Sequence, residues 1–168
     1  MDVTIRPVRP EEYEALGTLT ADAYLGDGLL DFGADDPYLS ELRAVGRRAA
    51  GAEVLVAVGA DGERLLGGVT YAAPGSPWAD IAAPDEAEFR MLAVARESRG
   101  QGAGEALVRA CVERARDAEG VGSLVLSTQA AMLSAHRIYR RLGFVRTPER
   151  DWDPVPGLPS LLTFRLKL

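Results

Sequence analysis

A glycine-rich turn between a predicted strand and a predicted helix constrains this chain more than any other feature. The strand is expected over residues 87–94, the turn runs from Arg99 to Gly104, and the helix is expected over residues 101–118. Another strand is predicted at residues 123–127. A strand, a helix and a second strand in succession favour a parallel crossover within one sheet.

The two strands before this unit predict the opposite orientation. Residues 53–59 and 64–73 flank Asp61-Gly62, a dipeptide typical of hairpin turns, so these strands should pair antiparallel. Together the two patterns predict an α+β fold with a single mixed, mainly antiparallel sheet flanked by helices. The remaining expected elements are strands at residues 3–8, 144–146 and 161–168, and helices at residues 10–24, 37–50 and 131–142.

Length and composition narrow the class of protein. The 168 residues suit one domain covering residues 1–168. With 19 basic and 25 acidic residues, the net charge of −6 argues against nucleic acid as a partner. One cysteine and one histidine exclude a zinc finger, and we expect no metal. The N-terminus lacks a signal-peptide pattern and no stretch is long enough to span a bilayer, which predicts a cytoplasmic protein without a membrane partner.

The glycine-rich turn also predicts a binding site for phosphate. Glycine has no Cβ to block a close approach, and a helix N-terminus offers unpaired N–H donors. The alternative is a connector that binds nothing. The dinucleotide fingerprint requires glycine where Glu105 stands, and the P-loop requires Gly-Lys followed by Ser or Thr, so neither motif applies.

Two segments together point to a known family. Arg99, Gly102 and Gly104 match the pattern Arg/Gln-x-x-Gly-x-Gly/Ala, and the segment from Ala135 to Phe144 matches Ala-x-x-x-Tyr-x-x-x-Gly-Phe. By these motifs and its order of elements, the chain resembles the GNAT superfamily of acetyl-CoA-dependent N-acetyltransferases over essentially its whole length. The resemblance implies acetyl-CoA as cosubstrate, held by residues of the strand and the turn: Met91, Leu92, Ala93, Val94, Arg99, Gly100, Gln101, Gly102, Ala103 and Gly104.

One position departs from the family pattern. Many members carry an asparagine seven residues before the tyrosine, where it contacts the CoA arm, and this chain has Met132 there. This substitution puts one cofactor contact in doubt. Ser134 is the candidate that would replace it.

The resemblance also implies roles in proton transfer. Glu88 is the candidate general base, and Tyr139 the candidate acid for the departing CoA thiolate. A backbone N–H near Leu92 would polarise the thioester carbonyl. The alternatives are an exposed strand-end carboxylate for Glu88, with a water chain as the base, and a packing role for Tyr139.

These assignments lead to one functional hypothesis and one competitor. We expect transfer of an acetyl group from acetyl-CoA to a primary amine of a small-molecule or peptide acceptor, by direct attack in a ternary complex. Cys111 is expected to be inert core and therefore unable to carry an acyl group. The competitor is a CoA-binding regulatory or structural module without turnover. A homodimer is a further expectation, since dimers are common in the family.

Two smaller features are left with open interpretations. Asp27, Asp31, Asp35 and Asp36 form an acidic segment that either attracts a cationic amine or is simply solvated. His136, three residues before the candidate acid, is either a proton relay or a partly exposed helix residue.

Overall fold

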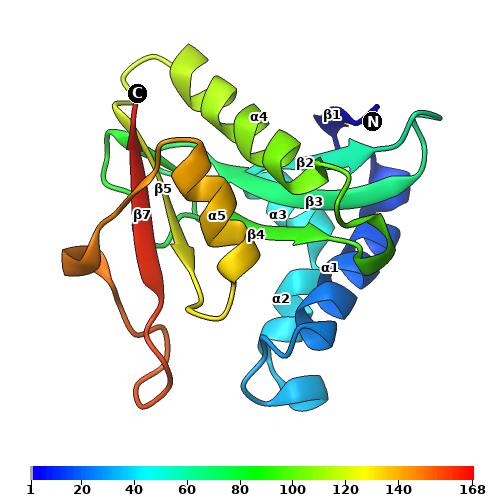
Figure 1. The fold of residues 1–168 in the computed structure, drawn as a ribbon, viewed down its shortest axis with the longest axis horizontal. Coiled ribbons are helices and arrows are strands. Elements are labelled where there is room, and N and C mark those ends of the chain that lie inside the picture. The colour runs from blue at the N-terminus through cyan, green and yellow to red at the C-terminus, as the bar shows by residue number, and fades with distance from the viewer. Residues whose placement is uncertain (1) are drawn as a thin grey trace.

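The computed structural model describes residues 2–168, so Met1, where the predicted domain begins, lies outside the described residues. Seven strands form one sheet in the order β1-β2-β3-β4-β5-β7-β6 (Figure 1). The β4–β5 pair is parallel, and the other five neighbouring pairs are antiparallel. The predicted mixed, mainly antiparallel sheet is therefore confirmed. The strands are β1 (Thr4–Pro7), β2 (Glu53–Val58), β3 (Leu65–Ala72), β4 (Glu86–Val94), β5 (Ser123–Thr128), β6 (Val145–Arg146) and β7 (Leu162–Lys167).

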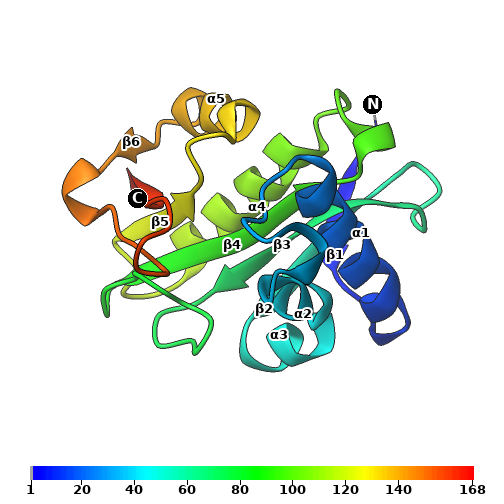
Figure 2. The same cartoon turned by 90° about the horizontal axis from the view of Figure 1, so that it is seen from below.

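Helices cover both faces of the sheet (Figures 1 and 2). On one face lie α4 (Ala103–Asp117) and α5 (Leu133–Arg141), and on the other lie α1 (Tyr13–Gly26), α2 (Tyr38–Arg43) and α3 (Val45–Gly51). Most predicted element bounds agree within about two residues. No helix in residues 2–168 is both long and apolar enough to cross a membrane.

The single helix predicted over residues 37–50 is wrong. The chain forms α2 and α3 with a break at Ala44, where ψ is 55°. A Cβ on Gly17 would come within 2.7 Å of the Arg43 carbonyl oxygen, so α1 packs directly against this break. The buried guanidinium of Arg48 donates to the carbonyls of Glu41 and Leu42, which replaces the hydrogen bonds lost at the end of α2. These contacts are tertiary, and the local sequence pattern does not reveal them.

The strand β4 has a feature that positions the rest of the site. It pairs with β5 from Glu86 to Phe89, and beyond that point the two strands diverge. Met91 has a φ of +57°, and the β3–β4 register shifts around it, so this part of β4 contains a bulge. The bulge changes which side chains face α4: Phe89 before it, but Leu92 and Val94 after it.

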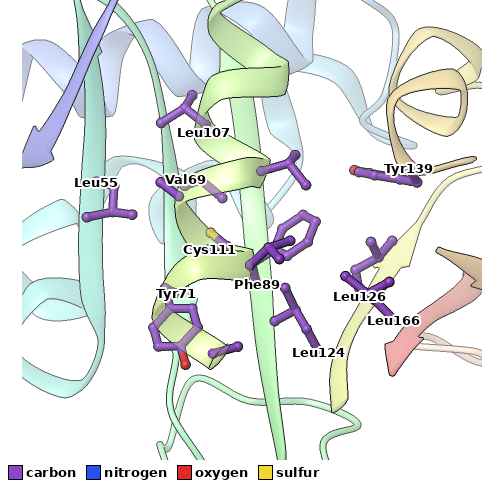
Figure 3. Packing of buried hydrophobic residues seen from close by; sticks show 14 of the residues in the cluster. Leu55, Val69, Tyr71, Phe89, Leu107, Cys111, Leu124, Leu126, Tyr139 and Leu166 are labelled. Atoms are coloured by element: carbon purple, nitrogen blue, oxygen red, sulfur yellow. The ribbon is translucent and has the colours of Figure 1, made fainter. Parts of the chain in front are cut away.

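The largest hydrophobic cluster lies between the sheet and the helices α4 and α5 (Figure 3). Leu107 and Cys111 of α4 are fully buried there and pack toward Phe89 and Leu124 of the sheet. Burial raises the pKa of the Cys111 thiol, so the thiolate is disfavoured. The expectation of an inert cysteine therefore agrees with its place in the core.

Candidate active site

A groove of about 680 Å³ runs along the N-terminal ends of α4 and α5 and the C-terminal half of β4. The glycine-rich turn forms one wall and the start of α5 forms the other. Both helices therefore direct their N-terminal ends, with free N–H donors and a partial positive charge, toward the same space. A pyrophosphate fits this electrostatic arrangement.

Gly100 and Gly102 give the turn its shape. Their φ angles are +81° and +84°, and a Cβ on either glycine would meet no atom within 4 Å. Glycine is needed here for backbone conformation, while the space beside the turn stays open. The first hydrogen bond of α4 runs from the Ala106 N–H to the Gly102 carbonyl, so the N–H groups before it have no partner inside the helix.

Gly104 has a different role. Its added Cβ would lie 3.3 Å from Ile138 of α5 and 3.6 Å from Val94 of β4. Because glycine has no Cβ, α4 can approach α5 and the sheet closely at this position. The two glycines that define the sequence signature therefore act differently: Gly102 by conformation and Gly104 by packing.

The predicted cofactor-binding residues divide between the groove and other surroundings. Leu92, Val94, Ala103 and Ser134 line the groove, as do Arg99 and the three glycines of the turn. The side chains of Met91 and Ala93 pack instead in the cluster beside α1 and α2, because of the bulge. Gln101 lines a separate hollow with Asp61 and Arg64. Met132 lines the groove, and its sulfur accepts a hydrogen bond from Thr128.

Arg99 is paired with an acid that the sequence did not connect to it. Its Nη1 donates to Asp27 Oδ1 over 2.9 Å, and its Nη2 donates to Oδ2 over 2.7 Å. Arg96 lies 3.7 Å from the same carboxylate. The hydrogen bonds from Arg99 lower the pKa of Asp27. One member of the acidic segment is thus part of the groove, 72 residues from its partner.

A second ion pair also borders the groove. Glu105, near the start of α4, lies 2.7 Å from the guanidinium of Arg141 on α5 and 3.2 Å from that of Arg109. Glu105 and Arg141 both line the groove, and sequence reasoning missed this pair. The i,i+4 spacing of Glu105 and Arg109 is visible in the sequence, whereas the link to α5 depends on the fold.

Glu88 is completely buried and not, as the alternative had it, an exposed strand-end carboxylate. Its Oε1 accepts the backbone N–H groups of Asp80, Ile81 and Ala82 over 3.0, 2.8 and 3.0 Å. Its Oε2 is buried without a partner among the described residues. Burial raises the pKa of this carboxyl, and the three N–H donors oppose that shift only in part.

Tyr139 lies on α5 among aromatic rings and is 2% exposed. The centroids of Phe89 and Phe164 are 5.8 and 5.6 Å from that of Tyr139. Figure 3 shows its hydroxyl directed away from α5, toward α4 and β4. Burial raises the pKa of the phenol, so it holds its proton firmly at neutral pH.

His136 is buried, and the expectation of a partly exposed residue is wrong. Its Nε2 lies 3.0 Å from the carbonyl of Gln129, which can only accept, so this nitrogen carries the hydrogen. Burial lowers the pKa of the imidazole, which favours this neutral form. The ring is enclosed because α5 folds back onto the end of β5, beside Thr128 and Phe164.

The opposite face of β4 carries a half-buried polar cluster that the sequence did not indicate. Arg90 donates to the Trp78 carbonyl over 3.0 Å and to the Tyr38 hydroxyl over 3.3 Å, and its Nε lies 3.2 Å from Asp80. Asp80 thus pairs with Arg90 through its side chain and bonds Glu88 through its backbone. The segment around residue 80 is therefore fixed to Glu88 and Arg90, which lie on the same face of β4.

Comparison with known proteins identifies the family. The model described as "Acetyltransferase (GNAT) family" matches residues 19–144. This chain belongs to the acetyltransferase (GNAT) family. The match includes the glycine turn, the groove and Tyr139, and the predicted family resemblance is confirmed.

Individual relatives agree with this assignment. N-acetyltransferase 8B of Homo sapiens is 46% identical over 56 residues, which cover 33% of this chain and 24% of the human protein. The chain spans about a quarter to a third of the length of the curated relatives it matches.

Solved structures show the same fold. A GNAT acetyltransferase of Staphylococcus aureus Mu50 has a TM-score of 0.75 and 13% identity, covering 99% of each chain. A phosphinothricin acetyltransferase of Sinorhizobium meliloti, in complex with AcCoA, has a TM-score of 0.72 and 19% identity, covering 100% of this chain and 89% of that one.

Proposed function

We propose that this GNAT protein transfers the acetyl group of acetyl-CoA to a primary amine by direct attack in a ternary complex. The observation that carries the proposal is the divergence of β4 and β5 after Phe89, next to the groove of the glycine turn. Tyr139 approaches this region from the α5 face, and Glu88 lies on the other face of β4. The two groups that would handle protons are therefore separated by the strand.

The groove supports binding of the cosubstrate. The unpaired N–H groups at the start of α4 would receive the pyrophosphate, and Leu92, Val94 and Ser134 would line the path of the pantetheine arm. The bulge at Met91 interrupts regular pairing with β3, which leaves backbone N–H groups near Leu92 as candidates to polarise the thioester carbonyl.

The proton balance assigns one role to each buried group. The amine nitrogen forms a bond to the carbonyl carbon, the C–S bond breaks, and the amine loses a proton. We propose that Glu88 receives this proton through water, because its carboxylate is buried and its Oε2 is unpaired. Tyr139 would supply a proton to the thiolate and recover one from solvent afterwards; its raised pKa ensures that the phenol is protonated before the step.

The acceptor is proposed only as a class. The relatives named N-acetyltransferase 8B and N-acetylaspartate synthetase support nitrogen as the acceptor atom. Asp31 and Asp35, exposed in the acidic segment, suit an approaching cationic amine. A small molecule and a peptide amine both fit this description.

The binding module without turnover remains the second candidate. The burial of Glu88 and of Tyr139, at 0% and 2% exposure, is the observation that favours it, because both side chains are almost inaccessible to solvent in this conformation. A panel of amines incubated with acetyl-CoA, with release of free thiol as the readout, tests the choice. Amine-dependent thiol release supports the enzyme. Tight acetyl-CoA binding without release for any amine class supports the module.

A further inference from the structure

Asp27 places a carboxylate beside the proposed binding site for the negatively charged pyrophosphate of acetyl-CoA. It lines the groove that would receive the pyrophosphate, together with Arg99. The carboxylate of Asp27 and a pyrophosphate in the same groove would repel each other. A neighbouring cation is therefore needed to offset the charge of the carboxylate. That cation is Arg99, the same side chain that would otherwise be free to contact the pyrophosphate.

Asp27 also begins the α1–α2 connection, defined here as residues 27–37. Two residues later, the Leu29 carbonyl accepts a hydrogen bond of 2.8 Å from Gln129 in the β5–α5 turn. The Leu29 side chain packs with Met91 and Ala93 of β4, and Figure 2 shows the connection passing over this strand. The connection is therefore attached to both turns that border the cofactor groove.

The Asp27–Arg99 pair is suited to exchange. The two side chains are 32% and 41% exposed, and exposed ion pairs contribute little net stability. A pyrophosphate carries two negative charges, so it competes well for the guanidinium. The other pair at the groove, Glu105–Arg141, joins two helices that are also held together by core packing. Loss of the Asp27–Arg99 pair would instead weaken the hold on a connection that is otherwise fixed here by Arg96 and by the Gln129–Leu29 hydrogen bond.

On the basis of the proposed function, we propose that Asp27 is a positioning residue that competes with the cosubstrate for Arg99. When the pyrophosphate takes Arg99, the α1–α2 connection loses its bidentate ion pair with the β4–α4 turn and keeps the weaker contacts of Arg96 with Asp27 and Gly26. The connection then opens over the α1–α3 face of β4, where the amine would approach. Cosubstrate binding and access of the amine are thereby coupled through one ion pair.

Calorimetric titration of the protein with acetyl-CoA tests this competition. Asp27→Asn should lower the Kd by about fivefold at low salt, because Arg99 is released and one like charge is removed. The matched control is Asp35→Asn, an exposed acid of the same connection outside the groove, which should leave the Kd unchanged. In an Arg99→Gln background the gain from Asp27→Asn should shrink to the smaller effect of charge removal alone.

Hydrogen exchange supplies a readout that bulk electrostatics would not give. Acetyl-CoA should increase amide exchange in residues 27–37 of the wild type, and Asp27→Asn should show this faster exchange without ligand. An unchanged or higher Kd for Asp27→Asn, or protection of residues 27–37 by acetyl-CoA, overturns the inference and leaves the proposed function intact. Absence of acetyl-CoA binding to the wild type would instead overturn the proposed function.

Discussion

The two faces of the sheet at β4 differ in how their sites are built. On the α4–α5 face, an open groove is lined by residues within 98–105, by residues within 131–141 opposite them, and by parts of β4 and the α1–α2 connection. On the α1–α3 face, Glu88 is buried and Arg90 half-buried, with polar partners from residues 78–82 and from Tyr38. The groove therefore contains one local motif, the glycine turn, completed by distant segments, whereas the polar cluster around Glu88 depends on long-range contacts throughout.

The charges of the two faces differ in the same way. The ion pairs at the groove, such as Arg99 with Asp27, are exposed and can exchange partners. On the other face, burial raises the pKa values of Glu88 and Asp80. We infer that the cofactor side is arranged to bind a mobile anion and the acceptor side to hold a carboxyl poised for protonation.

The largest expected effect concerns the glycine turn. Gly102→Val should abolish cosubstrate binding, because a β-branched residue strongly disfavours a φ of +84° and its side chain would enter the groove. Acetyl-CoA at a hundredfold excess over Kd should stabilise the wild type by about 2.7 kcal/mol, or roughly 5 to 10 °C in Tm. Thermal unfolding with and without acetyl-CoA measures the loss of this shift.

Gly157→Val is the matched control for this substitution. Gly157 has a φ of +86° and open space around it, but it lies outside the groove. It should lower the Tm through comparable backbone strain and keep the acetyl-CoA shift. A folded Gly102→Val protein with a normal shift would mean that the turn does not bind the pyrophosphate.

The next effect tests Tyr139 on the same face. Tyr139→Phe removes only the hydroxyl, so aromatic packing and acetyl-CoA affinity should remain. Turnover should fall by roughly ten- to a thousandfold, with kcat and kcat/KM lowered together. Tyr71→Phe is the control, since that hydroxyl is buried without a partner among the described residues but belongs to β3. Unchanged turnover in Tyr139→Phe would leave the tyrosine as a packing residue and favour the binding module.

A smaller change in rate is expected on the opposite face. If Glu88 accepts the amine proton, the rate should rise with pH through the raised pKa of its carboxyl. Glu88→Gln should remove that pH dependence and lower kcat/KM by roughly ten- to a hundredfold. A pH–rate profile for both proteins measures it, and an identical profile would show that water or another group is the base.

Glu88→Gln should lower the reaction rate but raise the stability of the fold. Because the folded-state pKa of Glu88 is raised, its contribution to stability is present at low pH and is lost as pH rises through that pKa. Glutamine keeps a side-chain oxygen for the three N–H donors and never ionises. Glu88→Gln should therefore gain stability relative to the wild type between pH 4 and pH 8 in urea unfolding. A constant difference across this range would contradict the raised pKa.

The smallest expected effect is on acetyl-CoA binding, and it tests whether Ser134 belongs to the proposed cofactor site. Ser134 is exposed at the start of α5 and lines the groove opposite the glycine turn. Ser134→Ala should raise the Kd for acetyl-CoA by about two- to tenfold, the range of one neutral hydrogen bond. Ser40→Ala, an exposed serine of α2 outside the groove, should leave it unchanged. Equal Kd values for all three proteins would remove Ser134 from the proposed site.

Sequence reasoning predicted the order of strands and helices and the mixed sheet well. The hairpin at Asp61-Gly62, the crossover after β4 and the glycine turn depend on neighbouring residues, and such patterns are visible in a linear chain. It failed at Ala44, where α1 packs against the break between α2 and α3. It also failed for the exposure of His136, because that depends on how α5 packs against β5.

The sequence by itself determined the mixed sheet and the backbone shape of the turn from Gly100 to Gly104, since glycine conformation and hydrophobic periodicity are local properties. Its two motifs also carried the resemblance to the family. Only the tertiary structure decided that Arg99 faces Asp27 and that Glu88 is buried under residues 80–82. The bulge at Met91 likewise appears only in the folded sheet, where it changes which β4 side chains face the groove. Each of these facts depends on which distant segments come into contact. The free energy of folding that selects those contacts is contributed by the whole core.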